Sequence, residues 1–236
     1  MTAIFKKDFK TFFITPVGYV FIGAFSLIMN VMFFVGNVLT TNQSSEIMGL
    51  FATMLSVLGF LVPLLTMRLM SEELKLGTDQ ALLTAPISVG EVVFGKFFAA
   101  MGVFLWGLVL TLIYPLVVTL FGNPEPWAII GNYVAIILAG GAYIAIGLFI
   151  SSLTENQLIS ALVSFGVFLL LPVIDYLGFF GGSVVQEVVK YISFTSRYQT
   201  GFAMGIFSLW DAFYYLSVIA IFLFLTMRVL EKKRYS

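Results

Sequence analysis

The chain has 236 residues, of which 60% are hydrophobic and only 10% are charged, whereas a soluble domain is usually about half apolar and a quarter charged. Its twelve basic and twelve acidic residues cancel, so no net field favours a nucleic acid or an acidic ligand. Because Cys and His are absent, thiol nucleophiles, disulfides, imidazole bases and the usual zinc sites are excluded, and with them most side-chain catalysis.

Six apolar segments are long enough to cross a membrane, because a hydrocarbon core of roughly 30 Å needs about 20 helical residues. Their runs are continuous rather than alternating, which favours helices over β-barrel strands. The segments are 17–39, 48–70, 92–121, 127–150, 158–177 and 209–230. The expected fold is therefore all-α: a polytopic membrane protein with six transmembrane helices, forming a single domain over residues 1–236.

The basic residues are distributed unevenly between the two sides of this predicted bundle. An even number of spans places both termini on one side, and ten of the twelve basic residues fall there: Lys6, Lys7, Lys10, Arg68, Lys75, Lys96, Arg228, Lys232, Lys233 and Arg234. Only Lys190 and Arg197 fall on the other side. Since Lys and Arg are enriched on the cytoplasmic side, both termini are expected in the cytoplasm.

Residues 1–15 form a distinct element before the first span. One helical face is aromatic, with Phe5, Phe9, Phe12 and Phe13. Another face is basic, with Lys6, Lys7 and Lys10. This pattern predicts an amphipathic helix in the membrane interface, ended by Thr15-Pro16; the alternative is an unstructured basic flank.

Local signals predict several helix boundaries. Ser88 with Glu91 and Thr154 with Gln157 have capping-box spacing. Three prolines inside spans predict kinks: Pro63, Pro115 and Pro172. Small residues within the fourth span are interpreted as helix-packing positions: Gly140, Gly141 and Ala145.

The segment 68–92 is predicted to be a cytoplasmic loop that contains a short helix. Glu72, Lys75 and Asp79 can support one another at i,i+3 and i,i+4, and Pro86 is expected to end the helix. A projecting amphipathic helix can dock in a partner's groove; the alternative is a solvated hairpin between two spans.

The next residues contain the glycine and lysine spacing of a phosphate-binding loop, from Gly90 to Lys96. The Ser or Thr that should follow the lysine is replaced by Phe97, and the segment leads into a membrane helix instead of linking a strand to a helix. The chain is therefore expected to have no nucleotide site of its own.

The outer connection 178–208 is too apolar for a free loop. We interpret it as one or two short helices that dip into the outer leaflet, and either gate a pathway or only cap the bundle. The gate candidates are Asp175 and Asp211, near the outer ends of the fifth and sixth spans, and Arg197, near the junction of the short helices.

The loop after the second span also resembles a family. It carries Glu72-Glu73, Gly77-Thr78, Leu82-Leu83, Pro86-Ile87 and Gly95-Lys96, a pattern similar to that of the permease subunits of ABC-2 type transporters. The beginning, KKDFKTFFITPVGYVFIG, and the end, FLFLTMRVLEKKR, look more narrowly like gliding-motility-associated permeases of the GldF type.

This resemblance implies the ABC-2 permease fold, which is that of type V exporters. It also implies that two permease domains work with two separate ATPase subunits, which bind ATP and Mg while the permease itself binds no cofactor. The implied ATPase-coupling residues are Glu72, Glu73, Lys75, Gly77, Thr78, Asp79, Leu82, Leu83 and Pro86. The second permease domain is either an identical copy or a GldG-like subunit with a large extracytoplasmic domain.

The function expected is that of a non-enzymatic membrane subunit of an ATP-powered exporter or mechanochemical complex in a bacterial inner membrane. Its partners would be the ATPase, the second permease subunit and the lipid bilayer, with no nucleic acid. Two alternatives remain: an ion-coupled secondary carrier, suggested by Asp175 and the intramembrane prolines, and a membrane scaffold that transports nothing. No sequence feature selects a substrate.

Overall fold

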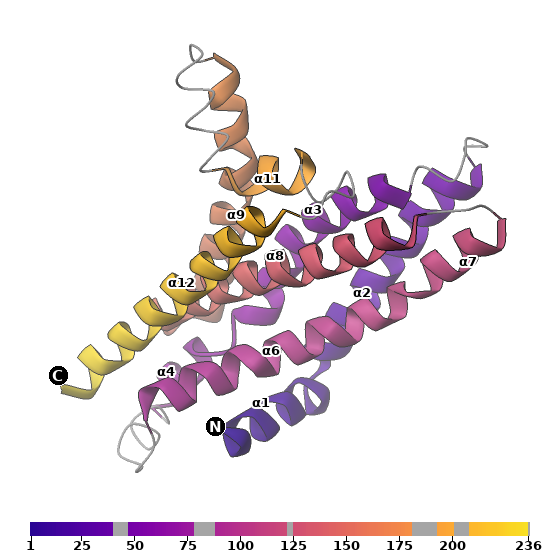
Figure 1. The fold of residues 1–236 in the computed structure, drawn as a ribbon. Helices are drawn as coiled ribbons and strands as arrows, with labels where there is room; N and C mark the ends of the chain where they lie inside the picture. The colour runs from indigo at the N-terminus through magenta and orange to yellow at the C-terminus, as the bar shows by residue number, and fades with distance from the viewer. Residues whose placement is uncertain (40–46, 78–87, 122–124, 181–192, 201–207, 236) are drawn as a thin grey trace.

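The computed structural model describes residues 1–39, 47–77, 88–121, 125–180, 193–200 and 208–235 (Figure 1). All regular elements within these ranges are helical. They are α1 (Thr2–Ile14), α2 (Pro16–Phe33), the π-helix η1 (Phe34–Leu39), α3 (Ile47–Thr66), α4 (Ser71–Leu76), α6 (Val89–Thr111), α7 (Ile113–Phe121), α8 (Pro126–Leu153), α9 (Gln157–Phe180), α11 (Phe194–Thr200) and α12 (Leu209–Tyr235).

Six stretches within the described residues are long and apolar enough to cross a membrane, as the sequence predicts. They are Pro16–Gly36, Gly49–Leu76, Val89–Leu120, Pro126–Leu153, Gln157–Ile174 and Leu209–Arg234. Each overlaps one predicted segment, so the expected all-α architecture with six spans is confirmed. The chain is a helical, multi-pass membrane protein.

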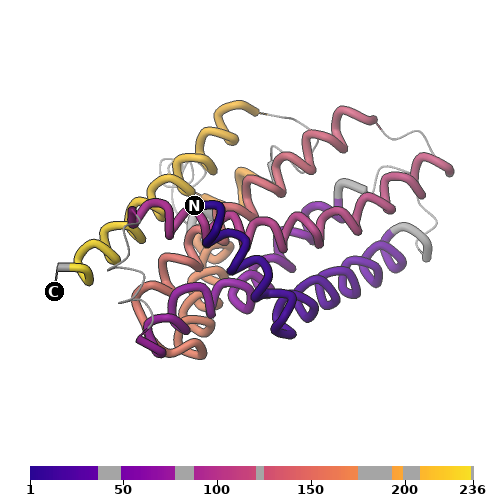
Figure 2. Tube along the Cα trace, turned by 90° about the horizontal axis from the view of Figure 1, so that it is seen from below, coloured from indigo at the N-terminus to yellow at the C-terminus, as the bar shows by residue number. Residues whose placement is uncertain are grey.

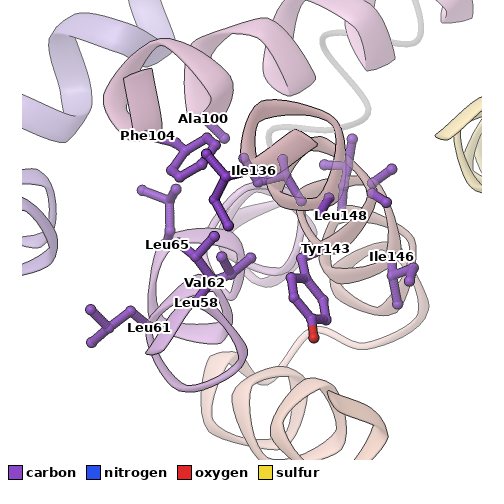
Figure 3. Packing of buried hydrophobic residues seen from close by; sticks show 14 of the residues in the cluster. Leu58, Leu61, Val62, Leu65, Ala100, Phe104, Ile136, Tyr143, Ile146 and Leu148 are labelled. Carbon is purple, nitrogen blue, oxygen red and sulfur yellow. The ribbon is translucent and has the colours of Figure 1, made fainter. Parts of the chain in front are cut away.

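The fourth span lies at the centre of the bundle. In its most hydrophobic window α8 is 78% buried, whereas the corresponding windows of α9 and α12 are 17% and 22% buried. Figure 3 shows buried side chains of α3, α6 and α8 converging, among them Leu58, Val62, Leu65, Phe104 and Tyr143. The outer helices instead expose large apolar side chains, as expected for lipid-facing surfaces.

Glycines allow the other helices to approach α8 closely. A Cβ atom on Gly140 would lie 2.5 Å from Cζ of Phe104 on α6, and one on Gly141 would lie 3.1 Å from Cδ1 of Ile219 on α12. Gly147 faces Thr66 of α3 in the same way. The interpretation of Gly140 and Gly141 as packing positions is confirmed.

The third span is interrupted, which the sequence predicts only as a kink at Pro115. Helix α6 ends at Thr111 and α7 begins at Ile113. Proline cannot donate to the carbonyl four residues earlier, and here that carbonyl, on Thr111, accepts a hydrogen bond of 2.9 Å from the hydroxyl of Tyr133 on α8. By contrast, α3 and α9 run through Pro63 and Pro172 without a break.

Replacing Tyr133 with phenylalanine tests this arrangement. The substitution leaves the Thr111 carbonyl without its donor, so we expect the free energy of unfolding to fall by about 1–3 kcal/mol. Thermal unfolding in detergent, followed by circular dichroism, measures the change. Tyr19→Phe on the exposed face of α2 is the matched control and should shift stability by less than about 0.5 kcal/mol; equal effects of the two variants would contradict the assigned role.

The two capping predictions have different outcomes. At α6, the Ser88 hydroxyl accepts from the backbone N–H of Glu91 at 3.2 Å, and the Glu91 carboxylate accepts from the backbone N–H of Ser88 at 3.4 Å, which confirms the capping box. At α9 the prediction for Thr154 is wrong, because Oδ1 of Asn156 accepts from the backbone N–H groups of residues 158 and 159 instead. Asn156 thus acts as the N-cap of α9, because its side-chain oxygen bonds to backbone N–H groups that have no partner within the helix.

Both ends of the described chain lie at the same end of the bundle as α4 (Figures 1 and 2). Lys233 of α12 donates to the Ser152 carbonyl at 3.1 Å. The neighbouring Ser151 hydroxyl accepts from the backbone N–H groups of Met70 and Ser71 at 3.1 Å each. We call this the terminal end of the bundle.

Candidate functional site

At the terminal end, helix α1 packs against α6. Thr15 is extended, with φ −88° and ψ 155°, and separates α1 from Pro16, the first residue of α2. The break expected at Thr15-Pro16 is thus confirmed. A Cβ atom on Gly95 or Gly102 of α6 would lie 2.9 Å from Ile4 or Phe9 respectively, so these two glycines let α1 lie directly on α6.

The buried stripe of α1 differs from the predicted aromatic face. The basic residues are exposed, as expected: Lys6, Lys7 and Lys10. Phe5 and Phe9, which are predicted to contact the membrane, are only partly exposed and stack on each other with ring centroids 5.6 Å apart. The buried residues of α1 are Ile4, Asp8 and Phe12. A carboxyl group thus lies on the side of the helix that faces the bundle.

Helix α4 is shorter than the sequence predicts. Helix α3 ends at Thr66, four turn residues follow, and α4 covers only Ser71–Leu76. Gly77 ends it with a φ of 66°, a left-handed conformation that glycine adopts without the steric cost of a Cβ atom. A single helix running on from Glu72 through Asp79 is therefore not formed, and the expected helix end at Pro86 lies outside the described residues.

The support predicted between Glu72 and Lys75 is not what holds α4. Glu72 instead accepts two hydrogen bonds from Arg68 in the turn after α3, from Nε at 2.8 Å and from Nη2 at 2.7 Å. A bidentate pair of this kind has a fixed geometry. Lys75 and Leu76 are exposed at the outer surface of α4, and Leu76 is 67% exposed.

Four charged residues from three helices meet where α1, α4 and α6 come together. Lys96 of α6 is only 2% exposed, and its Nζ lies 2.7 Å from the Leu69 carbonyl, 2.8 Å from Oε2 of Glu73 and 3.3 Å from Oδ2 of Asp8. Lys7 Nζ lies 2.9 Å from Oε1 of Glu73. We call Lys7, Asp8, Glu73 and Lys96 the ion cluster.

The charges of the ion cluster balance, and each carboxylate lies near an ammonium group. Burial raises the pKa of Asp8, Lys96 opposes this, and the charge of Glu73 adds to the rise. For Lys7, burial alone would lower the pKa, but the hydrogen bond to Glu73 and its negative charge raise it above the ordinary value. The cluster is therefore an electrostatically coupled joint, which is costly to break because Asp8, Glu73 and Lys96 are largely removed from water, whereas Lys7 stays exposed.

Glu73 and Lys7 are among the site residues predicted from the sequence, whereas Asp8 and Lys96 are not. Lys96 belongs to the phosphate-loop-like spacing that ends at Phe97, and also to the Gly-Lys pair of the family pattern. Its position inside α6 explains the pair: Gly95 admits Ile4, and Lys96 reaches back to Glu73 and Asp8. The signal in the sequence was Asp8 itself, the one acidic residue in a helix whose other residues are Lys, Phe, Ile, Thr and Ala.

A cavity of about 200 Å³ opens beside the ion cluster. Its polar wall contains the four cluster residues together with Arg68, Glu72, Thr11 and Thr15. Its apolar wall contains Phe12, Val17, Leu69 and Leu76. The cavity therefore combines paired charges with apolar surface at the junction of α1, α2 and α4.

Two of the outer-gate candidates come together at the opposite part of the bundle. Arg197 Nη1 of α11 lies 2.6 Å from Oδ1 of Asp211 on α12, and its guanidinium lies 4.7 Å from the ring centroid of Tyr214. The next residue, Tyr198, donates to the Phe51 carbonyl of α3 at 3.1 Å. These bonds join α11 to both α3 and α12.

Several predicted site residues lie outside the described part of the chain. In the predicted coupling segment these are Thr78, Asp79, Leu82, Leu83 and Pro86. In the outer connection they are the ranges 181–192 and 201–207, so α11 is the described part of the short helices expected there. Asp175 lies within α9, and its side chain is likewise outside the description.

The structure is that of a membrane-spanning protein in which the short helix α4, at the terminal end, is joined to α1 and α6 by ion pairs. The family profile described as ABC-2 family transporter protein matches residues 3–233, and the chain belongs to this family. Members of this family are membrane subunits that are not themselves catalytic. A sequence comparison with curated proteins gave no match.

Proposed function

We propose that this chain is the transmembrane subunit that couples ATP hydrolysis, carried out by separate ATPase subunits, to export or to mechanical work on an extracytoplasmic partner. In this proposal the terminal end faces the cytoplasm of a bacterium and the bundle lies in the inner membrane. The basic residues at this end and the family's ABC transporter membership support that orientation.

The proposal rests on how α4 is attached to the neighbouring helices. Its exposed surface presents Lys75 and Leu76, while its inward residue Glu73 is bonded to Lys7 of α1 and Lys96 of α6. A force applied to α4 by a partner would therefore be passed to α1 and α6 as well as to the second span. An isolated surface hairpin would have no such connection.

In this proposal, coupling arises because the ATPase pair contacts α4 differently in its ATP-bound state and in its free state. If the ATPase pair holds α4 differently in its ATP-bound and its free state, the equilibrium between two arrangements of the helices shifts. Only the difference in binding free energy between the two arrangements can drive the shift. The ion cluster keeps α1, α4 and α6 together during this movement.

The proposal also concerns the identity of the second permease subunit. The likeness of both chain ends to gliding-motility-associated permeases favours a GldG-like subunit with a large extracytoplasmic domain, on which mechanical work would be done. Two copies of this chain are the alternative pairing. Isolating the complex from its native membrane and determining its subunit composition distinguishes the two.

The coupling proposal is tested by changing the outward surface of α4 without touching the ion cluster. The double variant Lys75→Glu/Leu76→Asp should weaken association with the ATPase about tenfold or more, because it places two negative charges where an apolar contact is expected. Copurification and ATP hydrolysis in lipid nanodiscs measure the effect.

A matched control uses the same end of the bundle. Leu153 at the end of α8 is 55% exposed and Lys232 of α12 is also exposed, so Lys232→Glu/Leu153→Asp makes the same chemical changes away from α4. The control should retain ATPase binding. Equal retention of the ATPase by both double variants would overturn the role assigned to α4.

A further inference from the structure

The buried ammonium group of Lys96 is held from two sides. Its two shorter contacts are with the Leu69 carbonyl, 2.7 Å away, and with Oε2 of Glu73, 2.8 Å away. Both of these acceptors belong to α4 or to the turn that leads into it. The third contact, 3.3 Å from Oδ2 of Asp8, is with α1. Lys96 of α6 therefore has one carboxylate partner on α4 and a second on α1.

The contact between Lys96 and Asp8 is the weaker of the two ion pairs. Asp8 is buried, yet its Oδ2 accepts no hydrogen bond of good geometry from the described residues. Burial raises the pKa of Asp8, and the charge of Lys96 offsets this rise only in part. Since a buried carboxylate is stabilised by a close counter-charge, a shorter contact with Lys96 would stabilise Asp8 further.

The two carboxylates are attached to α6 in different ways. Asp8 belongs to α1, which lies directly on α6: a Cβ atom on Gly95, the residue before Lys96, would lie 2.9 Å from Cγ2 of Ile4. Helix α4 is joined to α6 through the Lys96 side chain, and its first backbone N–H group donates to Ser151 of α8. A cavity of about 200 Å³ lies beside α4, towards the junction of α1 and α2. A shift of α4 therefore leaves Asp8 beside Lys96.

Given the coupling role of α4 proposed above, on which this inference rests, we propose that Lys96 changes its partner from Glu73 to Asp8 when the ATPase displaces α4. The contact between Lys96 and Asp8 then shortens. Glu73 keeps Lys7 of α1, whose side chain is 60% exposed and free to follow it. Both arrangements thus contain two ion pairs, and neither leaves a buried ion without a counter-charge.

Asp8 is in this role a positioning residue, which acts through Lys96 and stabilises the displaced arrangement of α4. The three helices stay linked, because α4 remains bonded to α1 through Glu73 and Lys7, and α1 remains bonded to α6 through Asp8 and Lys96. A cluster with one fixed set of pairs would instead resist the displacement, since moving Glu73 away would leave the Lys96 ammonium buried and unpaired. The exchange of partners thus gives the ion cluster two stable states.

The purified full chain tests the exchange without any ATPase. In Glu73→Gln the loss of one counter-charge imitates the displacement, and Lys96 is expected to turn to Asp8. Adding Asp8→Asn leaves the ammonium without a carboxylate, so it should lower the folding equilibrium constant about a hundredfold or more. In the unaltered chain, where Glu73 holds Lys96, Asp8→Asn should lower it less than about tenfold. Denaturant titration in detergent micelles measures both effects.

Two further variants make this comparison specific. Glu155→Gln, at an exposed position between α8 and α9, removes a carboxylate elsewhere at the terminal end and should have the same small effect in both backgrounds. If Asp8→Asn/Glu73→Gln does not fold, adding Lys96→Met removes the unpaired ammonium and should restore folding. An equal effect of Asp8→Asn in both backgrounds, or no recovery with Lys96→Met, would overturn the proposal.

The complex with the ATPase tests the movement itself. Asp8→Asn should bind the ATPase as the unaltered chain does, but it should lower kcat for ATP hydrolysis in lipid nanodiscs about tenfold without changing KM for ATP. Asp8→Glu keeps the charge and should retain more of the turnover. Unchanged turnover of Asp8→Asn, in a complex whose unaltered form couples to ATP, would contradict the exchange. If the unaltered chain does not bind the ATPase, the coupling role fails instead, and the titrations of the isolated chain still decide whether Lys96 changes partner.

Discussion

Replacing Lys96 with methionine is expected to lower the free energy of unfolding by about 3–5 kcal/mol, the largest effect of any single substitution considered. Lys96 is 2% exposed, and its ammonium lies within 3.3 Å of both Asp8 and Glu73. Removing it leaves two carboxylates close together, with only the more exposed Lys7 to compensate them. Denaturant titration in detergent micelles, followed by circular dichroism, measures the loss.

The double variant Lys96→Met/Glu73→Gln makes this prediction specific. Neutralising Glu73 removes one of the two uncompensated charges, so the double variant should be more stable than Lys96→Met alone. Lys6→Met, an exposed residue of α1, serves as the control and should change stability by less than about 0.5 kcal/mol. If the second substitution brings no recovery, the ion cluster does not act as a coupled unit.

Replacing Gly147 with valine is expected to separate α8 from α3 and to cost about 1–3 kcal/mol. A Cβ atom at this position would lie 2.8 Å from Cβ and 3.0 Å from Cγ2 of Thr66, and Thr66 is fully buried. Since α8 is the central helix, its neighbours would have to move with it. Thermal unfolding in detergent measures the change in stability.

Gly23→Val on α2 is the matched control for this substitution. Nothing lies within 4 Å of a Cβ at Gly23, so the variant carries the same helix-propensity change without a clash. Thr66→Ala in the Gly147→Val background should restore part of the stability, because it removes Oγ1 and Cγ2 but leaves Cβ. Equal destabilisation at Gly23 and Gly147 would show that helix propensity and not packing is responsible.

The spans and several boundaries could be predicted from the sequence, because their causes are local or depend only on composition. A membrane helix needs a continuous apolar run of sufficient length, and the six predicted segments each overlap a span. The capping box at Ser88 and the break at Thr15-Pro16 involve residues at most three positions apart. Each of these signals involves only residues that are close together in the sequence.

Boundaries that depend on more than one local signal were less predictable. Thr154 has capping-box spacing, but Asn156 lies nearer the helix start and satisfies its N–H groups. In the predicted coupling segment the spacing of Glu72, Lys75 and Asp79 favours a longer helix. Gly77 ends α4 at Leu76 by taking the left-handed conformation.

The candidate site depended most on tertiary structure. By itself the sequence determined a six-span helical protein of the ABC-2 pattern, with a charged segment after the second span. The tertiary structure decided that Glu73 faces inward, since its partners are Lys7 of α1, which lies 66 residues away in the sequence, and Lys96 of α6. A buried charge is stable only beside its counter-charge, and the packing of α1 on α6 brings Asp8, Glu73 and Lys96 together.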